Sequence, residues 1–185
     1  MSPWRIRQIA KQLPRGAVIA YPTDTIWGLG CHPLSQQAVL RIQSIKHRPA
    51  RKSLILLGSS LAQAQAFIDK DTLARHENAL SQSYSRPRTW IVKASSECPG
   101  WLQADTGTIA FRLTDKPQIK LLCETIHAPL ISTSANISGR PTVRNSLQVH
   151  RHFQHQLDYI IEGFECADTQ ASEIREIDSG KILRA

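Results

Sequence analysis

The spacing of apolar residues along the chain predicts helices that alternate with short strands. Residues 4–13 carry apolar side chains at helical intervals, and Gly16 follows as a stop signal. A helix that begins near residue 35 should end before Pro49, because proline cannot continue a helix interior. The same periodicity predicts helices over residues 35–46, 61–68, 71–83 and 115–127.

Uninterrupted apolar runs of strand length lie between these helices. They occupy residues 17–21, 53–57, 89–94, 108–113 and 129–133. Near the end of the chain, EIREI and KILR flank Asp178-Ser179-Gly180, a sequence typical of a β-hairpin. The alternation of helices and strands predicts the α/β class with a mixed sheet.

Composition suggests one domain and an anionic partner. At 185 residues and 41% hydrophobic, the chain can bury one sizeable core and is short for two independent domains, so a single domain over residues 1–185 is expected. The 23 basic residues outnumber the 15 acidic ones, for a net charge of +8. Such a field attracts anions such as nucleotides or RNA.

Cysteine spacing and the first residues predict a reduced, cytoplasmic protein. The four cysteines lie far apart and form no C-x-x-C pair, so neither a zinc site nor a redox motif is indicated. The start, MSPWRIRQIAKQLPRG, has no apolar segment of signal-peptide length, and no run approaches the length of a membrane span. A soluble protein without membrane contact is expected.

The first candidate site is ISTSANISGRPT at residues 131–142. If the preceding strand continues, Ser132, Ser134 and Asn136 share one face and Thr133 lies on the other. Ligands of open α/β sheets gather outside strand ends, which favours a site. Hydroxyl, amide and glycine residues also form turns readily, so a purely structural role remains the alternative.

A second polar row lies in YPTDTIWG. Thr23 and Thr25 come directly after the strand of residues 17–21, and in an extended chain their side chains lie on the same side. Gly28 and Gly30 follow. Two such polar rows, each at the end of a strand, are harder to explain as turn-forming residues than one row would be. They indicate donors and acceptors for a polar ligand.

The third candidate is the basic cluster KHRPARK. Four cations, Lys46, Arg48, Arg51 and Lys52, occur within seven residues at a predicted helix end. Cations are also favourable at any helix C-terminus, so a structural role is open for each of them. As a set, Lys46 and Arg48 could converge on a polyphosphate, since arginine offers bidentate contacts.

Several standard sites are not indicated. The chain has no G-x-x-x-x-G-K-[ST] loop, and Gly28-Leu29-Gly30 lacks the third glycine of a dinucleotide fingerprint. The histidines of HRHFQH, residues 150–155, have no placed carboxylate or cysteine to complete a metal site, and a solvated basic helix is expected there. No protein metal site and no nucleophile elbow are expected.

Together, these motifs resemble the YrdC/TsaC family of threonylcarbamoyl-AMP synthases. The resemblance lies in YPTDTIWGLGC, the Lys46-x-Arg48 pair followed by KSLILL, STSANISG, and the tail ASEIREIDSGKILR. It implies a YrdC-like single domain, a twisted open mixed sheet with flanking helices and a concave basic face. It also implies conversion of L-threonine, bicarbonate and ATP to threonylcarbamoyl-AMP and pyrophosphate, for threonylcarbamoyl-adenosine in tRNA.

The resemblance also assigns roles to individual residues. Arg112 is expected to hold the substrate carboxylate. The threonine-binding set is Thr23, Thr25, Arg112, Ser132, Ser134 and Ser172. The ATP-binding set is Lys46, Arg48, Lys52, Thr89, Asn136, Arg144 and Arg184. The catalytic set is Lys46, Arg48, Ser134 and Asn136.

ATP is expected as a substrate, with Mg²⁺ carried by its triphosphate. One departure is notable: where the family reads Pro-Gly-Pro-x-Thr, residues 85–89 are Ser-Arg-Pro-Arg-Thr, so ATP placement could differ. Contact with tRNA or other RNA, and transient contact with the threonylcarbamoyl-transfer machinery, are further expectations. The alternative function is a basic RNA-binding protein of the same fold, acting in ribosome or tRNA maturation with little or no catalysis.

Overall fold

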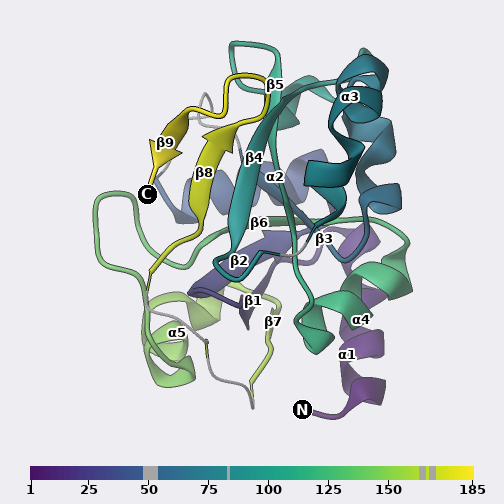
Figure 1. The fold of residues 1–185 in the computed structure, drawn as a ribbon. Helices are drawn as coiled ribbons and strands as arrows, with labels where there is room; N and C mark the ends of the chain where they lie inside the picture. The colour runs from purple at the N-terminus through teal and green to yellow at the C-terminus, as the bar shows by residue number, and fades with distance from the viewer. Residues whose placement is uncertain (48–53, 83, 163–165, 167–169) are drawn as a thin grey trace.

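A large mixed sheet forms the centre of the molecule. The computed structural model describes residues 1–47, 54–82, 84–162, 166 and 170–185. The strands are β1 (Ile19–Pro22), β2 (Trp27–Cys31), β3 (Ile55–Gly58), β4 (Arg88–Lys93), β5 (Thr108–Leu113), β6 (Leu130–Ser134), β7 (Tyr159–Ile160), β8 (Glu173–Glu176) and β9 (Ile182–Arg184). They form one nine-stranded sheet in the order β7-β1-β2-β6-β3-β5-β4-β8-β9 (Figure 1).

Five α-helices and four short 3₁₀-helices are found in the described residues. The α-helices are α1 (Pro3–Ala10), α2 (Gln36–Ile45), α3 (Lys70–Ser81), α4 (Pro117–Ile126) and α5 (Ser146–Phe153). The 3₁₀-helices are η1 (Leu13–Arg15), η2 (Leu61–Phe67), η3 (Gly100–Leu102) and η4 (Gln154–Gln156). No helix in the described part of the chain is both long and apolar enough to cross a membrane.

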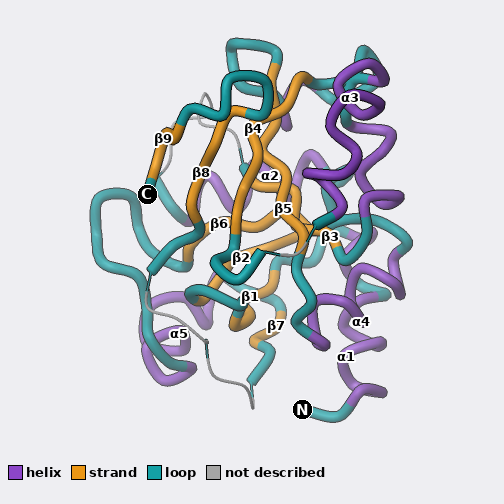
Figure 2. Tube along the Cα trace, in the orientation of Figure 1, coloured by secondary structure: helices purple, strands orange, loops and turns teal. Residues whose placement is uncertain are grey.

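The strand pairing confirms the predicted mixed α/β class. β3 runs parallel to β5, β4 parallel to β8 and β1 parallel to β7, whereas the remaining neighbours are antiparallel. Parallel neighbours need crossover connections, and the helices between them provide these. The sequence order of the strands therefore differs strongly from their order in the sheet, which brings distant segments side by side (Figure 2).

Strand alternation divides the core between the two faces of the sheet. Leu57 and Leu130 pack in a cluster with residues of α1 and α4. Leu56 and Ile131, one position away on the same strands, pack in a second cluster with residues of α2. Successive side chains of a strand point to opposite faces, so each strand contributes to both clusters.

Two strands that the hydrophobic pattern did not predict are β2 and β7. β2 follows β1 as an antiparallel hairpin partner, yet glycine occupies positions 28 and 30. A Cβ at Gly30 would lie 2.5 Å from the carbonyl oxygen of Ile131 and 2.7 Å from Cε1 of Tyr21. Glycine at position 30 thus permits β2 to lie close to the backbone of β6. A residue with a side chain, such as valine or isoleucine, would prevent this approach. β7 has only two residues, too few for a periodic signal.

The helix predictions hold with one correction. Residues 61–68 are predicted to be α-helical, and Leu61–Phe67 instead form a 3₁₀-helix. The second helix spans Gln36–Ile45, in agreement with the predicted range 35–46, and His47 takes a left-handed backbone conformation at φ 49°. Residues 48–53, which include Pro49, lie outside the described residues.

The predicted hairpin at the end of the chain is confirmed. β8 and β9 pair antiparallel, and Gly180 takes φ 69° in the turn between them. The turn contacts α3, because Asp178 Oδ1 accepts a bond from Arg75 Nη1 at 2.7 Å and lies 2.9 Å from His76 Nε2. These contacts join the hairpin to a helix about 100 residues earlier in the chain, since Arg75 and Asp178 are 103 positions apart.

Candidate active site

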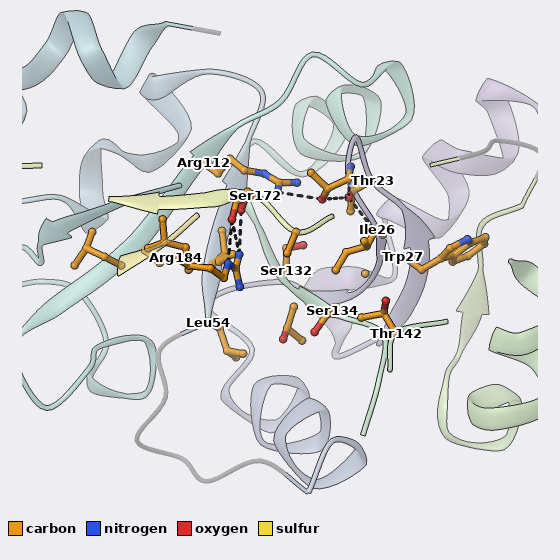
Figure 3. Close-up of a pocket in the computed structure, with 18 residues that line it drawn as sticks. Thr23, Ile26, Trp27, Leu54, Arg112, Ser132, Ser134, Thr142, Ser172 and Arg184 are labelled. Carbon is orange, nitrogen blue, oxygen red and sulfur yellow. Dashed lines mark hydrogen bonds between the residues drawn. The ribbon is translucent and has the colours of Figure 1, made fainter. Parts of the chain in front are cut away.

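A cavity of about 240 Å³ opens on one face of the sheet (Figure 3). Further along the same strands, residues of α1 and α4 pack against this face. Strand parity explains its position: Ser132 and Ser134 continue the face of Leu130, and Ile55 continues that of Leu57. The lining includes two arginines and no acidic side chain among the described residues. The lining residues are Thr23, Thr25, Ile26, Trp27, Gly28, Leu54, Ile55, Ile91, Ala110, Arg112, Ser132, Thr133, Ser134, Thr142, Ala171, Ser172, Ile174 and Arg184.

One wall of the cavity is the turn between β1 and β2. The Thr23 hydroxyl donates to the carbonyl of Ile26 at 2.7 Å and accepts from the Thr25 backbone N–H at 3.0 Å. The two hydroxyl oxygens lie 3.0 Å apart, and both side chains are buried. This turn is therefore internally bonded, and its hydroxyl groups sit in fixed positions at the edge of the cavity.

Arg112 reaches the same turn from β5. Its Nη2 donates to Asp24 Oδ1 at 2.6 Å, and its Nη1 lies 3.4 Å from Thr25 Oγ1. The residue is only 4% exposed, and its buried Nε has no hydrogen-bond partner among the described residues. Burial lowers the pKa of Arg112, while the Asp24 carboxylate acts in the opposite direction. An arginine nevertheless keeps its charge at neutral pH, so the guanidinium supplies a fixed cation.

The opposite wall consists of the segment before β8 and the end of β9. Arg184 Nε and Nη2 donate to the carbonyl of Ser172 at 3.0 and 2.8 Å. The Ser172 hydroxyl lies 2.8 Å from that of Thr89, and both residues are buried. Burial lowers the pKa of Arg184, and the positive charge of Arg112 lowers it further. Two like charges thus face the same cavity, an arrangement that an anionic ligand would stabilise.

β6 supplies the hydroxyl row that the sequence predicted. Ser132 and Ser134 both line the cavity, in agreement with their shared parity. Thr133 lines it too, so the expected assignment of Thr133 to the opposite face alone was too strict. The cavity therefore includes the last three residues of β6 (Leu130–Ser134), whatever their parity.

Lys46 lies beneath the turn that follows β6. The residue is 1% exposed, and its Nζ donates to the carbonyl oxygens of Ser134 and Asn136 and, at 3.0 Å, to Asn136 Oδ1. Asn136 Oδ1 also accepts from the Ser134 hydroxyl at 2.6 Å. A buried ammonium group that donates to these oxygen atoms stabilises the path of this turn. Its expected contact with phosphate is not tested by this geometry.

Asn136 and Arg144 line a second pocket of about 310 Å³. Thr142 lines both this pocket and the first cavity, so the two adjoin. Asn136 Nδ2 donates to the carbonyl oxygens of Ile137 and Arg140 at 3.0 and 2.6 Å. Every polar atom of the Asn136 side chain is therefore engaged in holding the loop that separates the two spaces.

The structure brings together all six residues of the expected threonine-binding set and Arg184 of the ATP set. Thr89 lies behind Ser172, Lys46 beneath the turn, and Asn136 and Arg144 in the adjoining pocket. Arg48 and Lys52 lie outside the described residues. The roles of all these side chains remain predictions.

Sequence reasoning did not identify the apolar walls or Asp24. Ile91, Ala110 and Ile174 line the cavity from β4, β5 and β8, and ordinary strand residues carry no signal of such a role. Asp24 could have been singled out as the acidic residue between Thr23 and Thr25. Its partner Arg112 is 88 residues away, however, and no local pattern indicates that pairing.

The unusual arginines of residues 85–89 do not crowd the cavity. Arg88 has the strand parity of Trp90, whose side chain belongs to the core on the other face of the sheet. Its Nε donates to Glu173 Oε1 at 2.8 Å, and its guanidinium lies 4.1 Å from the centre of the Tyr84 ring. Arg88 is thus occupied by a carboxylate and an aromatic ring.

The fold and the cavity define an α/β protein with a cavity lined by two arginines and several hydroxyl groups, next to a second pocket. The chain belongs to the Sua5/YciO/YrdC family: the family model, described as telomere recombination, matches residues 11–185. A threonylcarbamoyl-AMP synthase of Stutzerimonas stutzeri (strain A1501) is 39% identical over 181 residues, which cover 98% of this chain and 97% of that protein. The resemblance inferred from the motifs is confirmed.

Solved structures agree with this assignment. Sua5 of P. abyssi complexed with L-threonine superposes with a TM-score of 0.87 at 27% identity, covering 100% of this chain and 54% of that one. The present chain therefore spans about half the length of that Sua5 protein. E. coli YciO has the same fold, with a TM-score of 0.84 at 24% identity over 99% of this chain and 89% of that one.

Proposed function

We propose that this protein is an L-threonylcarbamoyladenylate synthase. The observation that carries the proposal is the cavity in which Arg112, Arg184 and two rows of hydroxyl groups converge, with no acidic side chain among its described lining residues. Such a site suits a small zwitterion with a carboxylate and a hydroxyl group. Relatives named threonylcarbamoyl-AMP synthase and the Sua5 structure that contains L-threonine support this assignment.

The proposed substrates are L-threonine, bicarbonate and ATP. Bicarbonate loses water to give carbon dioxide, and the deprotonated amine of threonine attacks it. A C–N bond forms, and, counted from the ammonium form of threonine, the overall products of this step are a carbamate, one water and one proton. A carbamate oxygen then attacks the α-phosphorus of ATP, a new O–P bond forms, and the bond to the β-phosphate oxygen breaks with release of pyrophosphate. This sequence needs no side-chain nucleophile, so the protein acts by positioning the reactants and neutralising charge.

Arg112 is proposed to hold the threonine carboxylate, since Arg112 lines the cavity and its buried Nε–H has no partner in the described part of the chain. Hydroxyl groups of Thr23 and Ser132 would accept or donate bonds to the rest of the amino acid. Arg184 enters the cavity from the other side, where it would contact the carbamate or the α-phosphate. The adjoining pocket of Asn136 and Arg144 would take the nucleoside.

Mg²⁺ is proposed to enter with ATP. No group of three or more potential metal ligands is found among the described residues, and the described cavity lining holds no carboxylate. The ion would therefore be ligated mainly by phosphate oxygens and water, as is common for magnesium nucleotides. Its chemistry would be to neutralise the triphosphate and stabilise the leaving pyrophosphate.

The product is proposed to serve threonylcarbamoyl-adenosine formation in tRNA. Contact with tRNA and with a transfer enzyme are finer parts of the same proposal. The alternative of an RNA-binding protein without catalysis receives no support from the relatives. One of its arguments, the extra arginines, is weakened because Arg88 is paired with Glu173.

Incubation of the purified protein with ATP, L-threonine, bicarbonate and Mg²⁺ tests the proposal. We expect mass spectrometry to detect threonylcarbamoyl-AMP, with pyrophosphate in equal amount and no product when threonine is omitted. Arg112→Gln is the matched variant and should lose most of the activity, because a charge-assisted bond contributes about 1.5 to 3 kcal/mol. Absence of the adenylate from folded wild-type protein would refute the assignment.

A further inference from the structure

We propose that Asp24 is a positioning residue that orients Arg112 for the substrate carboxylate. This inference rests on the proposed function and concerns a residue outside the cavity lining. Asp24 lines a separate pocket of about 40 Å³ with Trp90, Leu113 and Arg88, on the other side of the sheet end. It therefore acts through Arg112 and does not itself touch the ligand.

The geometry ties one end of the guanidinium to the carboxylate. Arg112 Nη2 donates to Asp24 Oδ1 at 2.6 Å, and Nη1 lies 3.4 Å from Thr25 Oγ1. Both partners belong to the β1–β2 turn, so this turn holds the guanidinium at its Nη end. Two of the five N–H donors of the guanidinium are thus engaged. The Nε–H is a further donor: Arg112 lines the cavity, and its Nε–H is buried with no hydrogen-bond partner among the described residues. A planar guanidinium fixed at one end presents its other donors in a defined direction.

The turn that carries Asp24 is itself fixed from several sides. The Thr23 hydroxyl bonds to the Ile26 carbonyl and the Thr25 N–H, at 2.7 and 3.0 Å. Lys116 Nζ donates to the Thr23 carbonyl at 2.8 Å, which joins the turn to the segment that follows β5. A carboxylate on such a rigid turn can hold the position of a long side chain.

Charge balance provides a second argument. Arg112 is 4% exposed, and a buried cation is costly unless an anion compensates it. Among the described residues, the cavity lining supplies no acidic side chain. Asp24, which lies outside the cavity, is the carboxylate that neutralises Arg112. The cavity side of the guanidinium then remains open for the carboxylate of the ligand.

Steady-state kinetics of Asp24→Asn test this role. The amide keeps the shape of the carboxylate and removes its charge. We expect the KM for threonine to rise about tenfold or more, as for the loss of one charge-assisted contact, while the KM for ATP stays within about twofold. Asp115→Asn is the matched control: Asp115 lines the same small pocket but is exposed, and its variant should leave both constants unchanged.

A second comparison separates orientation of Arg112 from general damage to the fold. In an Arg112→Gln background no buried cation needs a partner, so adding Asp24→Asn should leave the KM for threonine unchanged. A further rise in that background, equal changes in both KM values for Asp24→Asn, or no change at all would overturn the inference. If wild-type protein forms the adenylate, these results bear on Asp24 alone and leave the proposed function standing.

Discussion

Single residues decide how closely the strands around the site can approach. Gly28 and Gly30 have the parity of the cavity face, and the side chains of Tyr21 and Ser132 occupy the space that larger residues would need. At Gly28 a Cβ would lie 3.2 Å from Thr23 Cγ2 and 3.4 Å from Ser132 Oγ, which is tight but not forbidden. At Gly30 the nearest atom belongs to the backbone and cannot move aside.

Gly30→Ala should therefore destabilise the fold. The added Cβ would lie 2.5 Å from the Ile131 carbonyl, so β2 and β6 must separate, at a cost of about 1 to 3 kcal/mol. Gly100→Ala is the control, because none of the atoms surveyed in the described residues lies within 4 Å of its Cβ position, and it should change stability by less than about 0.5 kcal/mol. Chemical denaturation measures both; equal midpoints for the two variants would show that the close approach is not strained.

At the scale of elements, β8 and β9 complete the site from the end of the chain. The hairpin is held to β4 by parallel pairing and by the Arg88–Glu173 ion pair, and to α3 by Asp178. Because Ser172 precedes β8 and Arg184 lies in β9, anything that loosens this hairpin also displaces one wall of the cavity.

The pairing of β8 should weaken in acid through Glu173. A hydrogen bond from Arg175, with a second from Arg88, lowers the pKa of Glu173 in the folded protein. A depressed carboxyl pKa contributes stability that is present above the unfolded value of about 4.3 and is lost as pH falls through the folded value. The stability gap between wild type and Glu173→Gln should thus be largest at neutral pH and shrink below about pH 4.

Urea denaturation at several pH values would measure that gap. Glu97→Gln serves as the control, because Glu97 is exposed and its variant should follow the wild type at every pH. A gap between wild type and Glu173→Gln that stays constant from pH 7 to pH 3 would contradict the role assigned to the two arginines.

At the scale of the whole molecule, bound ligands should raise the stability of the folded state. Arg112 and Arg184 repel each other across one cavity, and the positive charge of Arg112 already lowers the pKa of Arg184. Bound anions remove this repulsion, and any ligand that binds only the folded state raises its stability. The site is built from strands that extend from β2 to β9 in the sheet order, so its occupation should stabilise most of the sheet.

Threonine and magnesium-ATP together should raise the melting temperature. At concentrations near 100 times Kd, each ligand contributes about 2.7 kcal/mol, which corresponds to roughly 5 to 10 °C per ligand for a protein of this size. Thermal unfolding at matched ionic strength with sodium chloride alone provides the control. For ligands enclosed in a cavity, the rise in melting temperature should persist at high salt. The affinity of purely electrostatic RNA binding, in contrast, falls steeply with salt. No shift at saturating ligand would contradict enclosure of both substrates.

The sequence by itself determined most elements, the α/β class and the two hydroxyl rows. These depend on short-range periodicity: strand parity placed Ser132 and Ser134 on one face, and Asp178-Ser179-Gly180 marked the final hairpin. The glycines of β2 concealed a strand because they fit a close contact and carry no β preference of their own.

Only the tertiary structure decided which distant residues meet. Arg112 contacts Asp24, 88 positions away, because the order of strands brings the end of β5 to the β1–β2 turn. The same order places Arg88 beside Glu173 on the far face and leaves Arg112 at the cavity. Neighbours along a strand are set by local geometry, whereas neighbours across a sheet depend on its long-range pairing, and this pairing converts separate polar rows into one cationic cavity.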